Sequence, residues 1–275
     1  MYRFVLTICL LGFTCGFAQP KPSDDLADYY GKGYAYYCVG KYHAAIEQFG
    51  KALDRNPSDI DAWYNRALAR KNVNDFAGAI EDYNKVIELS PEDAEAFYNR
   101  AYARAELKDH RGAIRDYTQA LKLTPNDADA YLNRGNANVA ISEYRSAIAD
   151  FSKVIAMRPY SYQGYYNRGN ARRESIDLDG AIDDYTKVLE LNEGFSPAFV
   201  SRAAAKIEAQ DYKGAIRDCN FALEIASYDG EIYFYRALAK LEMNEHEPAC
   251  EDFRKAKELF FDKANDRLKS ICGAR

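Results

Sequence analysis

A single distance of 34 residues organises this chain. The segment GAIRDYTQALKLTP (residues 112–125) follows GAIEDYNKVIELSP (residues 78–91) at that distance, and SAIADFSKVIAMRP (residues 146–159) comes one step later. One alanine series keeps the same step at Ala45, Ala79, Ala113, Ala147, Ala181, Ala215 and Ala249. Repetition at a fixed period, without insertions, predicts stacked copies of one structural unit.

Each unit divides into two amphipathic segments, as residues 94–127 illustrate. Phe97, Ala101 and Leu107 recur at helical spacing in the first segment, and a second apolar stripe begins at Ala113. Lys108 and Asp109 form a short polar break between them, Pro125 ends the second segment, and Asn126 and Asp127 can cap the next helix. The sequence therefore predicts a helix–turn–helix unit, with alanine where two helices cross closely.

These units resemble tetratricopeptide repeats. The resemblance rests on an aromatic residue near the start, a small residue four positions later, an alanine and an aromatic in the second helix, and a closing proline. In one unit these residues are Trp63, Ala67, Ala79, Tyr83 and Pro91. The resemblance implies an all-α, right-handed superhelical solenoid of seven repeats.

The expected domain organisation follows from this repeat. We expect repeats at residues 26–59, 60–93, 94–127, 128–161, 162–195, 196–229 and 230–263, followed by a short capping helix and tail at 264–275. In the last three repeats Glu193, Ser227 and Phe261 replace the closing proline, so we expect less rigid junctions there.

The first 18 residues have the order of a secretory signal peptide. An early Arg3 precedes an apolar run that ends in small residues before Gln19. We therefore predict an exported protein, periplasmic or secreted and typical of a bacterial envelope, with residues 19–25 as a disordered lead. Membrane attachment would require an uncleaved signal or lipidation at Cys9 or Cys15, and neither cysteine follows the small residue usual at lipidation sites.

Composition and motifs favour binding over catalysis. The formal net charge is −5, which argues against a nucleic-acid partner. The chain has no phosphate-binding glycine loop and no hydrolase or metalloprotease motif. His43, His110 and His246 lie in separate units, so we predict no metal, no cofactor and no catalytic residue.

Four cysteines follow the signal-like segment: Cys38, Cys219, Cys250 and Cys272. Their irregular spacing predicts neither a zinc site nor a disulfide framework. Export would permit a disulfide, and Cys219 with Cys250 is the pair we would test, because both fall on neighbouring helices. Buried apolar thiols are the other interpretation.

Charged residues form the first repeated row along the superhelix. Arg66, Arg100, Arg134, Arg168, Arg202 and Arg236 are each followed sixteen residues later by an aspartate, at Asp82, Asp116, Asp150, Asp184, Asp218 and Asp252. We hypothesise one Arg–Asp ion pair in each hairpin, with a structural role. A basic stripe that binds ligand is the alternative.

Two polar rows give the candidate binding site. Asparagine is a mediocre helix residue, yet it recurs in the first helices, where its amide could hold an extended peptide. We predict a peptide-binding groove formed by Asn65, Asn99, Asn133 and Asn167, extended by Asn136 and Asn170, with apolar contact from Tyr64, Tyr98 and Tyr166. The alternatives are asparagines that bond a neighbouring helix and tyrosines that pack against the next repeat.

The function predicted from these rows is non-catalytic protein–protein interaction in the concave groove. The ligand would be a protein or peptide. Acids at helix starts, among them Asp61, Glu95, Asp129 and Glu231, would favour a basic one if they line the groove. The alternatives are a structural scaffold of an envelope assembly that uses its outer faces, and an accessory subunit of a larger complex.

Overall fold

The computed structural model describes residues 29–273, in which every regular element is a helix. In chain order these elements are α1 (Tyr29–Cys38), α2 (Tyr42–Arg55), α3 (Ile60–Asn72), α4 (Phe76–Leu89), α5 (Ala94–Glu106), α6 (His110–Leu123), α7 (Ala128–Ala140), α8 (Tyr144–Met157), α9 (Tyr162–Glu174), α10 (Leu178–Leu191), α11 (Ser196–Glu208), α12 (Tyr212–Ile225), α13 (Gly230–Glu242), α14 (His246–Glu258), α15 (Lys263–Arg267) and the π-helical η1 (Leu268–Cys272). The predicted signal and the lead at 19–25 lie outside the described residues.

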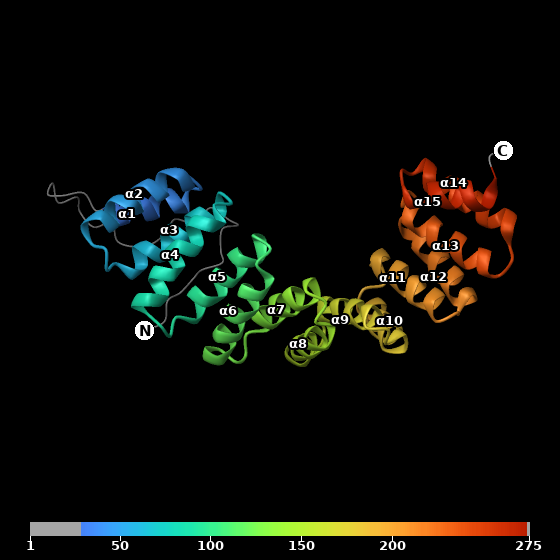
Figure 1. Cartoon of the computed structure of the whole chain (residues 1–275), viewed down its shortest axis with the longest axis horizontal. Coiled ribbons are helices and arrows are strands. Elements are labelled where there is room, and N and C mark those ends of the chain that lie inside the picture. The colour runs from blue at the N-terminus through green and yellow to red at the C-terminus, as the bar shows by residue number, and fades with distance from the viewer. Residues whose placement is uncertain (1–28, 274–275) are drawn as a thin grey trace.

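The helices α1 to α14 form seven antiparallel pairs that stack into an arch (Figure 1). Each second helix packs against its own first helix and against the first helix of the next pair. The predicted all-α solenoid of repeats is therefore confirmed.

Local sequence fixes where these helices begin and turn. Asp127 caps α7 by accepting from the backbone N–H of Asp129 at 2.9 Å and of Ala130 at 3.0 Å, which is the role expected of it. Within each pair the turn contains one residue with positive φ. That residue is Gly40, Asn74, Lys108, Ser142, Ile176, Gln210 or Asn244.

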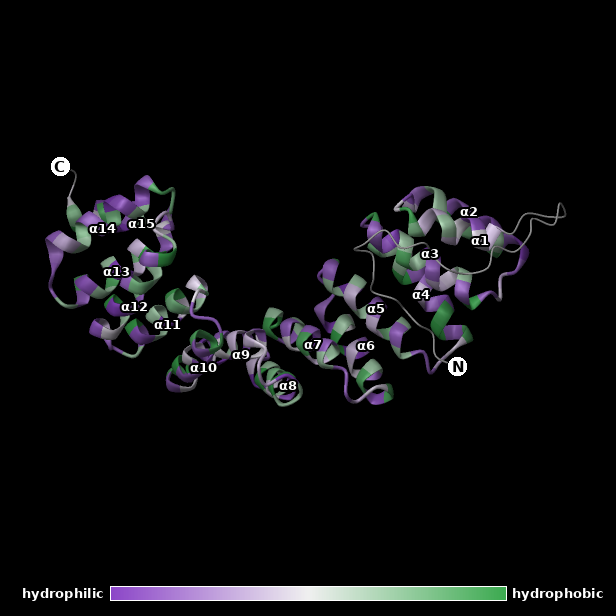
Figure 2. Cartoon of the chain, turned by 180° about the vertical axis from the view of Figure 1, so that it is seen from behind, coloured by the Kyte–Doolittle hydropathy of each residue, from purple (hydrophilic) through white to green (hydrophobic). Residues whose placement is uncertain are grey.

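Small residues set the distance between the helices of a pair. Gly135 occupies the position of Ala101 in the preceding repeat, and a Cβ atom there would lie 2.6 Å from Cε1 of Phe151. Figure 2 shows hydrophobic and hydrophilic residues on the same helices, as stacking of one buried face requires. The core is therefore a series of small clusters repeated along the arch.

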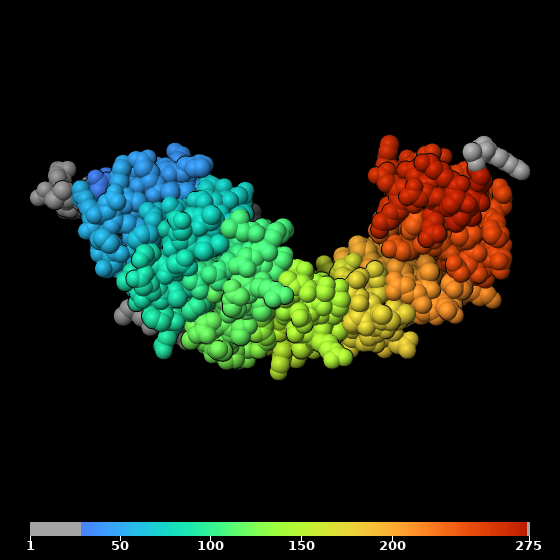
Figure 3. Space-filling view, viewed as in Figure 1, coloured from blue at the N-terminus to red at the C-terminus, as the bar shows by residue number. Residues whose placement is uncertain are grey.

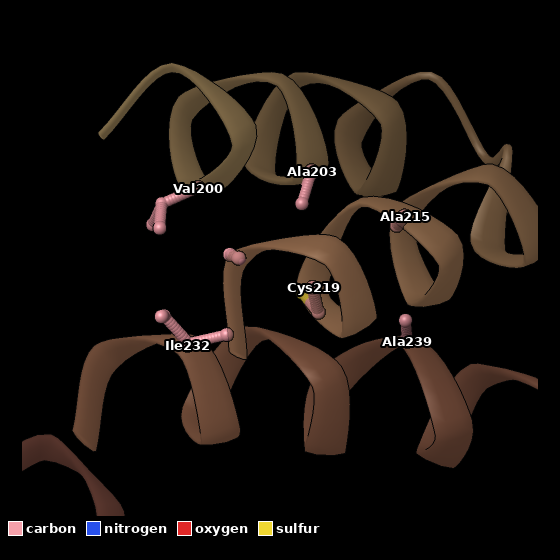
Figure 4. Packing of buried hydrophobic residues seen from close by; sticks show 7 residues of the cluster. Val200, Ala203, Ala215, Cys219, Ile232 and Ala239 are labelled. Carbon is pink, nitrogen blue, oxygen red and sulfur yellow. The ribbon is translucent and has the colours of Figure 1, made fainter. Parts of the chain in front are cut away.

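One such cluster joins three helices near the C-terminal end. Figure 4 shows Val200 and Ala203 on α11, Cys219 on α12, and Ile232 on α13 around one apolar interior. Cys219 is fully buried there and makes no disulfide. Burial and the neighbouring Asp218 raise the pKa of its thiol to about 12.

The last repeat is closed by α15 and η1, which together form the predicted cap. Ala264 is fully buried, and Leu268 packs against the cluster that contains Phe234 and Phe253. A disulfide between Cys250 and Cys272 joins α14 to the end of this cap.

The pairing considered from the sequence, Cys219 with Cys250, is therefore wrong. The reason is the order of packing. Helix α13 contacts both α12 and α14 and so lies between the helices that carry these two cysteines.

Candidate functional site

The inner surface of the arch is built from the first helix of each pair. In the middle of Figure 1, α5 and α7 lie nearer the hollow than α6 and α8. Successive first helices also contact each other directly from α5 through α13, as expected on the side with the smaller radius. The space-filling view shows the hollow between the two ends of the arch (Figure 3).

The Arg–Asp row forms the predicted ion pairs in the six hairpins that carry it, which are the second to the seventh. Each arginine Nη2 lies 2.6–2.7 Å from Oδ1 of its aspartate, and Nε donates to Oδ2 at 2.8–2.9 Å. The six aspartates are buried. This two-point geometry is the strong form of the interaction.

Most of these arginines also reach back to the preceding repeat. Nη1 of Arg134 donates to Oγ1 of Thr118 at 3.1 Å, and Nη1 of Arg100 donates to Oδ1 of Asn84 at 2.8 Å. Each guanidinium also lies over the aromatic ring three residues before it, as Arg66 lies 4.7 Å above Trp63. These contacts give the arginines a structural role that joins three helices.

The aspartates have a second partner that sequence reasoning missed. It is Arg70, Arg104, Asn138, Arg172, Lys206 or Lys240, on the same first helix one turn after the arginine. The signal was available, because a basic residue recurs at this position in five of the six hairpins. Only Asp150 has a neutral second partner, since Asn138 donates to it at 3.2 Å.

The asparagine and tyrosine rows prove to be two halves of one inter-repeat ladder. The amide Nδ2 donates to the hydroxyl of a tyrosine 35 residues earlier, at Asn65–Tyr30 (3.0 Å), Asn99–Tyr64 (3.0 Å) and Asn133–Tyr98 (2.8 Å). The hydroxyls of Tyr166 and Ser201 make the same connection at 3.3 Å. We call this set the Tyr–Asn ladder.

The first part of the ladder is internally satisfied. Tyr64 and Asn99 are buried, and Oδ1 of Asn99 accepts from Nζ of Lys71 at 2.9 Å. Tyr98 is half-buried against the ring of Tyr117, and burial raises the pKa of its hydroxyl. These tyrosines and Asn99 thus pack and bond between repeats, as the alternative interpretation holds.

The ladder is interrupted in the middle of the arch. Leu132 stands where a tyrosine would bond Asn167, and Asn167 instead donates to Oδ1 of Asn136 at a long 3.4 Å. Asn136 is exposed, and Oδ1 of Asn170 accepts from the hydroxyl of Tyr185 at 2.8 Å.

Around the interruption, four side chains keep hydrogen-bonding capacity, and we call them the central amides: Asn133, Asn136, Asn167 and Asn170. Asn133 is among them although it retains its rung with Tyr98. Within residues 29–273, no hydrogen bond engages Oδ1 of Asn133 or Asn167, or Nδ2 of Asn136 or Asn170. Each can therefore still bond a ligand.

Charged groups along the inner surface are mostly compensated. Arg158 and Asp129 form a two-point ion pair with distances of 2.7 and 2.9 Å, and the hydrogen bond from Arg158 lowers the pKa of Asp129. Arg173 lies 3.5 Å from a carboxylate oxygen of Glu174 and 3.5 Å from one of Glu208. Asp129, one of the acids considered as ligand contacts, is thus already paired.

Two further observations bear on the class of function. No set of three or more histidine, cysteine, aspartate or glutamate side chains in the described part of the chain is placed to hold a metal ion. No helix among residues 29–273 has the length and apolar character needed to cross a membrane.

Comparison with known proteins identifies the repeat. A TPR repeat profile matches residues 33–73 and 102–142, and two tetratricopeptide repeat profiles match residues 60–93 and 128–197. A search of curated proteins found no match.

Solved structures share the fold. The crystal structure of MamA is 25% identical over 60% of this chain and 90% of that chain, with a TM-score of 0.59. YrrB, a TPR protein described as having an unusual peptide-binding site, is 20% identical over 68% of this chain and 96% of its own, with a TM-score of 0.61. The C-terminal part of a TPR repeat-containing protein from Cytophaga hutchinsonii is 19% identical over 87% and 99%, with a TM-score of 0.73.

Proposed function

Because the chain belongs to the tetratricopeptide repeat family, we propose that it is a non-catalytic protein-interaction module that holds an extended segment of a partner protein against the central amides. The observation that carries the proposal is the interruption of the Tyr–Asn ladder at Leu132. Elsewhere the ladder's amide groups bond hydroxyls of the neighbouring repeat. Here donors and acceptors of the concave face remain available.

Asparagine suits this task because its amide offers both a donor and an acceptor to a peptide group. Four such side chains on α7 and α9 could bond successive peptide groups without reading sequence. Each bond contributes about 1 kcal/mol net. With a few apolar contacts, and after the cost of ordering the peptide, we expect micromolar affinity, on the order of −8 kcal/mol.

The proposal retains only some of the site residues that the sequence predicted. Tyr64, Tyr98 and Asn99 support the groove from within, and Asn65 and Tyr166 belong to rungs of the ladder. Asn133 also belongs to a rung, and we retain it because it is the neighbour of Leu132 in the sequence and its Oδ1 is available. The ligand contacts that we propose are the central amides. The peptide-binding site named for YrrB belongs to that protein, and the proposal rests on residues of this chain.

A selection from a phage-displayed library of random dodecapeptides tests the proposal, followed by fluorescence anisotropy of the selected peptides. We expect the double variant Asn136→Ala, Asn167→Ala to bind them at least tenfold more weakly with an unchanged circular dichroism spectrum. Asn99→Ala is the matched control, because the amide of Asn99 already bonds Tyr64 and Lys71. It should lower stability and keep affinity. Equal binding by the double variant would move the site away from the central amides.

We also propose that the protein works outside the cytoplasm, in the periplasm or as a secreted protein. The disulfide between Cys250 and Cys272 supports this location, since disulfides persist in oxidising compartments. Amino-terminal sequencing of protein from a periplasmic extract should begin at Gln19. A cytoplasmic product that begins at Met1 would contradict the proposal.

Exposed apolar side chains favour a second candidate function, a scaffold that binds through surfaces other than the concave face. Phe221, Tyr228 and Phe260 are 52%, 88% and 91% exposed. Tyr228 and Phe260 border a hollow of about 570 Å³ between the loops that follow α12 and α14. Exposed aromatic side chains of this kind are frequent at protein interfaces. Loss of a protein partner in Phe260→Ser, with the peptides above still bound, would assign that partner to this surface.

A further inference from the structure

A second opening on the concave surface lies beyond the central amides, between α9, α11 and α13. It is a cavity of about 180 Å³, and its lining includes Tyr166 on α9, Val200 and Ser201 on α11, and Glu231 and Tyr235 on α13. We call it the Val200 cavity.

The cavity exists because the Tyr–Asn ladder changes composition here. Val200 occupies the tyrosine position of its repeat, and Ser201 and Tyr235 occupy asparagine positions. The hydroxyls of Tyr166 and Ser201 still form a rung at 3.3 Å. The next rung is missing, since valine offers neither a ring to fill the space nor a hydroxyl to bond Tyr235.

The charge that faces this space is negative and not neutralised by an ion pair. Glu231 is half-buried and forms no salt bridge with any residue in the described part of the chain. Asp229, also in the lining, caps α13 by accepting from the backbone N–H of Glu231 at 2.9 Å. Burial, and then the charge of Asp229, raise the pKa of the Glu231 carboxyl.

The one basic residue in the lining is already compensated. Arg173 lies 3.5 Å from Glu208 and 3.5 Å from Glu174. Lys263, outside the lining, also acts on Glu231, since its positive charge and that of Arg173 lower the pKa of this carboxyl. The group formed by Asp229, Glu231, Glu174, Glu208, Arg173 and Lys263 therefore carries a net formal charge of about −2. An incoming cation would be attracted, and an anion would have to compete with two carboxylates for Arg173.

We propose that the Val200 cavity is a subsite for a lysine or arginine side chain of the bound partner segment. The walls supply what such a side chain needs. The carboxylate of Glu231 would compensate the charge, the rings of Tyr166 and Tyr235 in the lining would supply aromatic contact to a cation, and Val200 would contact the aliphatic stem.

This assignment rests on the proposed function and makes it more specific. A peptide held by the central amides on α7 and α9 would continue along the concave surface towards α11 and α13. The part of the peptide that contacts the last two repeats would then carry a basic residue. A metal ion fits the site poorly, since the described residues place no set of three ligands there.

The subsite can be tested without any peptide, using n-butylammonium as a probe. Its titration should produce saturable amide ¹H–¹⁵N shifts at Ser201, Ala204 and Glu231, with dissociation in the millimolar range. Glu231→Gln should weaken this binding at least fivefold. The control Glu224→Gln removes an exposed acid on α12 and should leave it unchanged. Neutral 1-butanol should bind no better to the wild type than to Glu231→Gln.

Equal binding of n-butylammonium to wild type and Glu231→Gln would overturn the proposal. Saturable binding of acetate in its place would also overturn it, by showing that Arg173 dominates the cavity. Both measurements use the full-length chain, with at most one residue substituted.

A peptide measurement separates this proposal from the function it rests on. In a peptide selected on the wild type, lysine replaced by norleucine should lose about tenfold in affinity, and Glu231→Gln should remove that difference. Peptide binding that survives Asn136→Ala, Asn167→Ala, with n-butylammonium still bound, would refute the central-amide site and keep the subsite. Peptide binding that depends on the central amides, without lysine preference or n-butylammonium binding, would refute the subsite alone.

Discussion

The amide of Asn133 donates a 2.8 Å hydrogen bond to the hydroxyl of Tyr98, which lies one repeat and one residue earlier. The same offset joins Asn99 to Tyr64 and Asn65 to Tyr30. Where the tyrosine position holds Leu132, Asn167 loses this partner. A single side chain thus distinguishes a rung that binds neighbouring repeats together from amides that can bind something else.

Leu132→Tyr should restore the missing rung. A new hydrogen bond to Asn167 would raise the free energy of unfolding by about 1 kcal/mol, and it would lower peptide affinity by occupying the amide. Thermal unfolding followed by circular dichroism measures the first effect, and anisotropy of the selected peptides measures the second. Leu132→Phe supplies the ring without the hydroxyl and is the control. If it stabilises the protein equally, ring packing and not the hydrogen bond is responsible.

The Arg–Asp row predicts a graded loss of stability. Arg134→Leu would leave the buried Asp150 with only the neutral Asn138 as partner, so we expect a loss of about 3–5 kcal/mol. Arg202→Leu should cost less, because Lys206 remains 2.8 Å from Asp218. Urea unfolding of the two variants gives the comparison.

These two arginines are well matched for this test. Arg134 donates to Thr118 and Arg202 to Thr186, at 3.1 and 2.9 Å. Each also lies above an aromatic ring, at 5.4 and 5.6 Å. An intact Arg134→Leu variant that had lost peptide binding would instead place the row in ligand recognition.

The turn between α9 and α10 offers a stabilising change. Ile176 adopts φ 67° and is 81% exposed, so it bears the cost of a left-handed conformation without a packing gain. Asparagine tolerates this conformation and stands at the equivalent position in Asn74 and Asn244. Ile176→Asn should therefore raise the free energy of unfolding by about 1 kcal/mol, measured by thermal unfolding. Ile176→Val keeps the β-branch and should give no gain.

Much of this fold could be predicted because each structural role recurs at one position of the repeat. The Arg–Asp pairs followed from a spacing of sixteen residues, since an antiparallel hairpin brings those two levels together. The ladder was less visible. Its tyrosine and asparagine rows were recognised separately, and the offset of 35 residues joins different repeats. The available signal was Leu132 at a tyrosine position, 35 residues before Asn167.

What could not be predicted depends on departures from the repeat. The Val200 cavity forms where valine, serine and tyrosine occupy three ladder positions of the last repeats. No periodic pattern in the sequence predicts this combination. The disulfide partner was missed for a similar reason. Cys272 lies in the cap, outside the repeat. The 34-residue period therefore does not predict which residue of α14 it faces.

The buried thiol of Cys219 should resist alkylation. With its pKa raised to about 12 by burial and Asp218, the thiolate fraction at pH 8 is on the order of 10⁻⁴, and the side chain is fully buried. Iodoacetamide at pH 8 should modify Cys219 only after unfolding in urea, as shown by peptide mass mapping. Rapid modification of the native protein would indicate that α11, α12 and α13 open locally.

Loss of the Cys250–Cys272 bridge should loosen the last repeat. A disulfide that closes a loop of 22 residues contributes about 3 kcal/mol on chain-entropy grounds. Cys272→Ser should therefore raise amide hydrogen exchange in α14, α15 and η1, and leave the central repeats nearly unchanged, because each repeat contacts only its neighbours. A reductant should reproduce the effect in the wild type and add nothing to Cys272→Ser. If the reduced wild type keeps full protection, packing of Ala264 and Leu268 against Phe234 and Phe253 is sufficient to hold the cap.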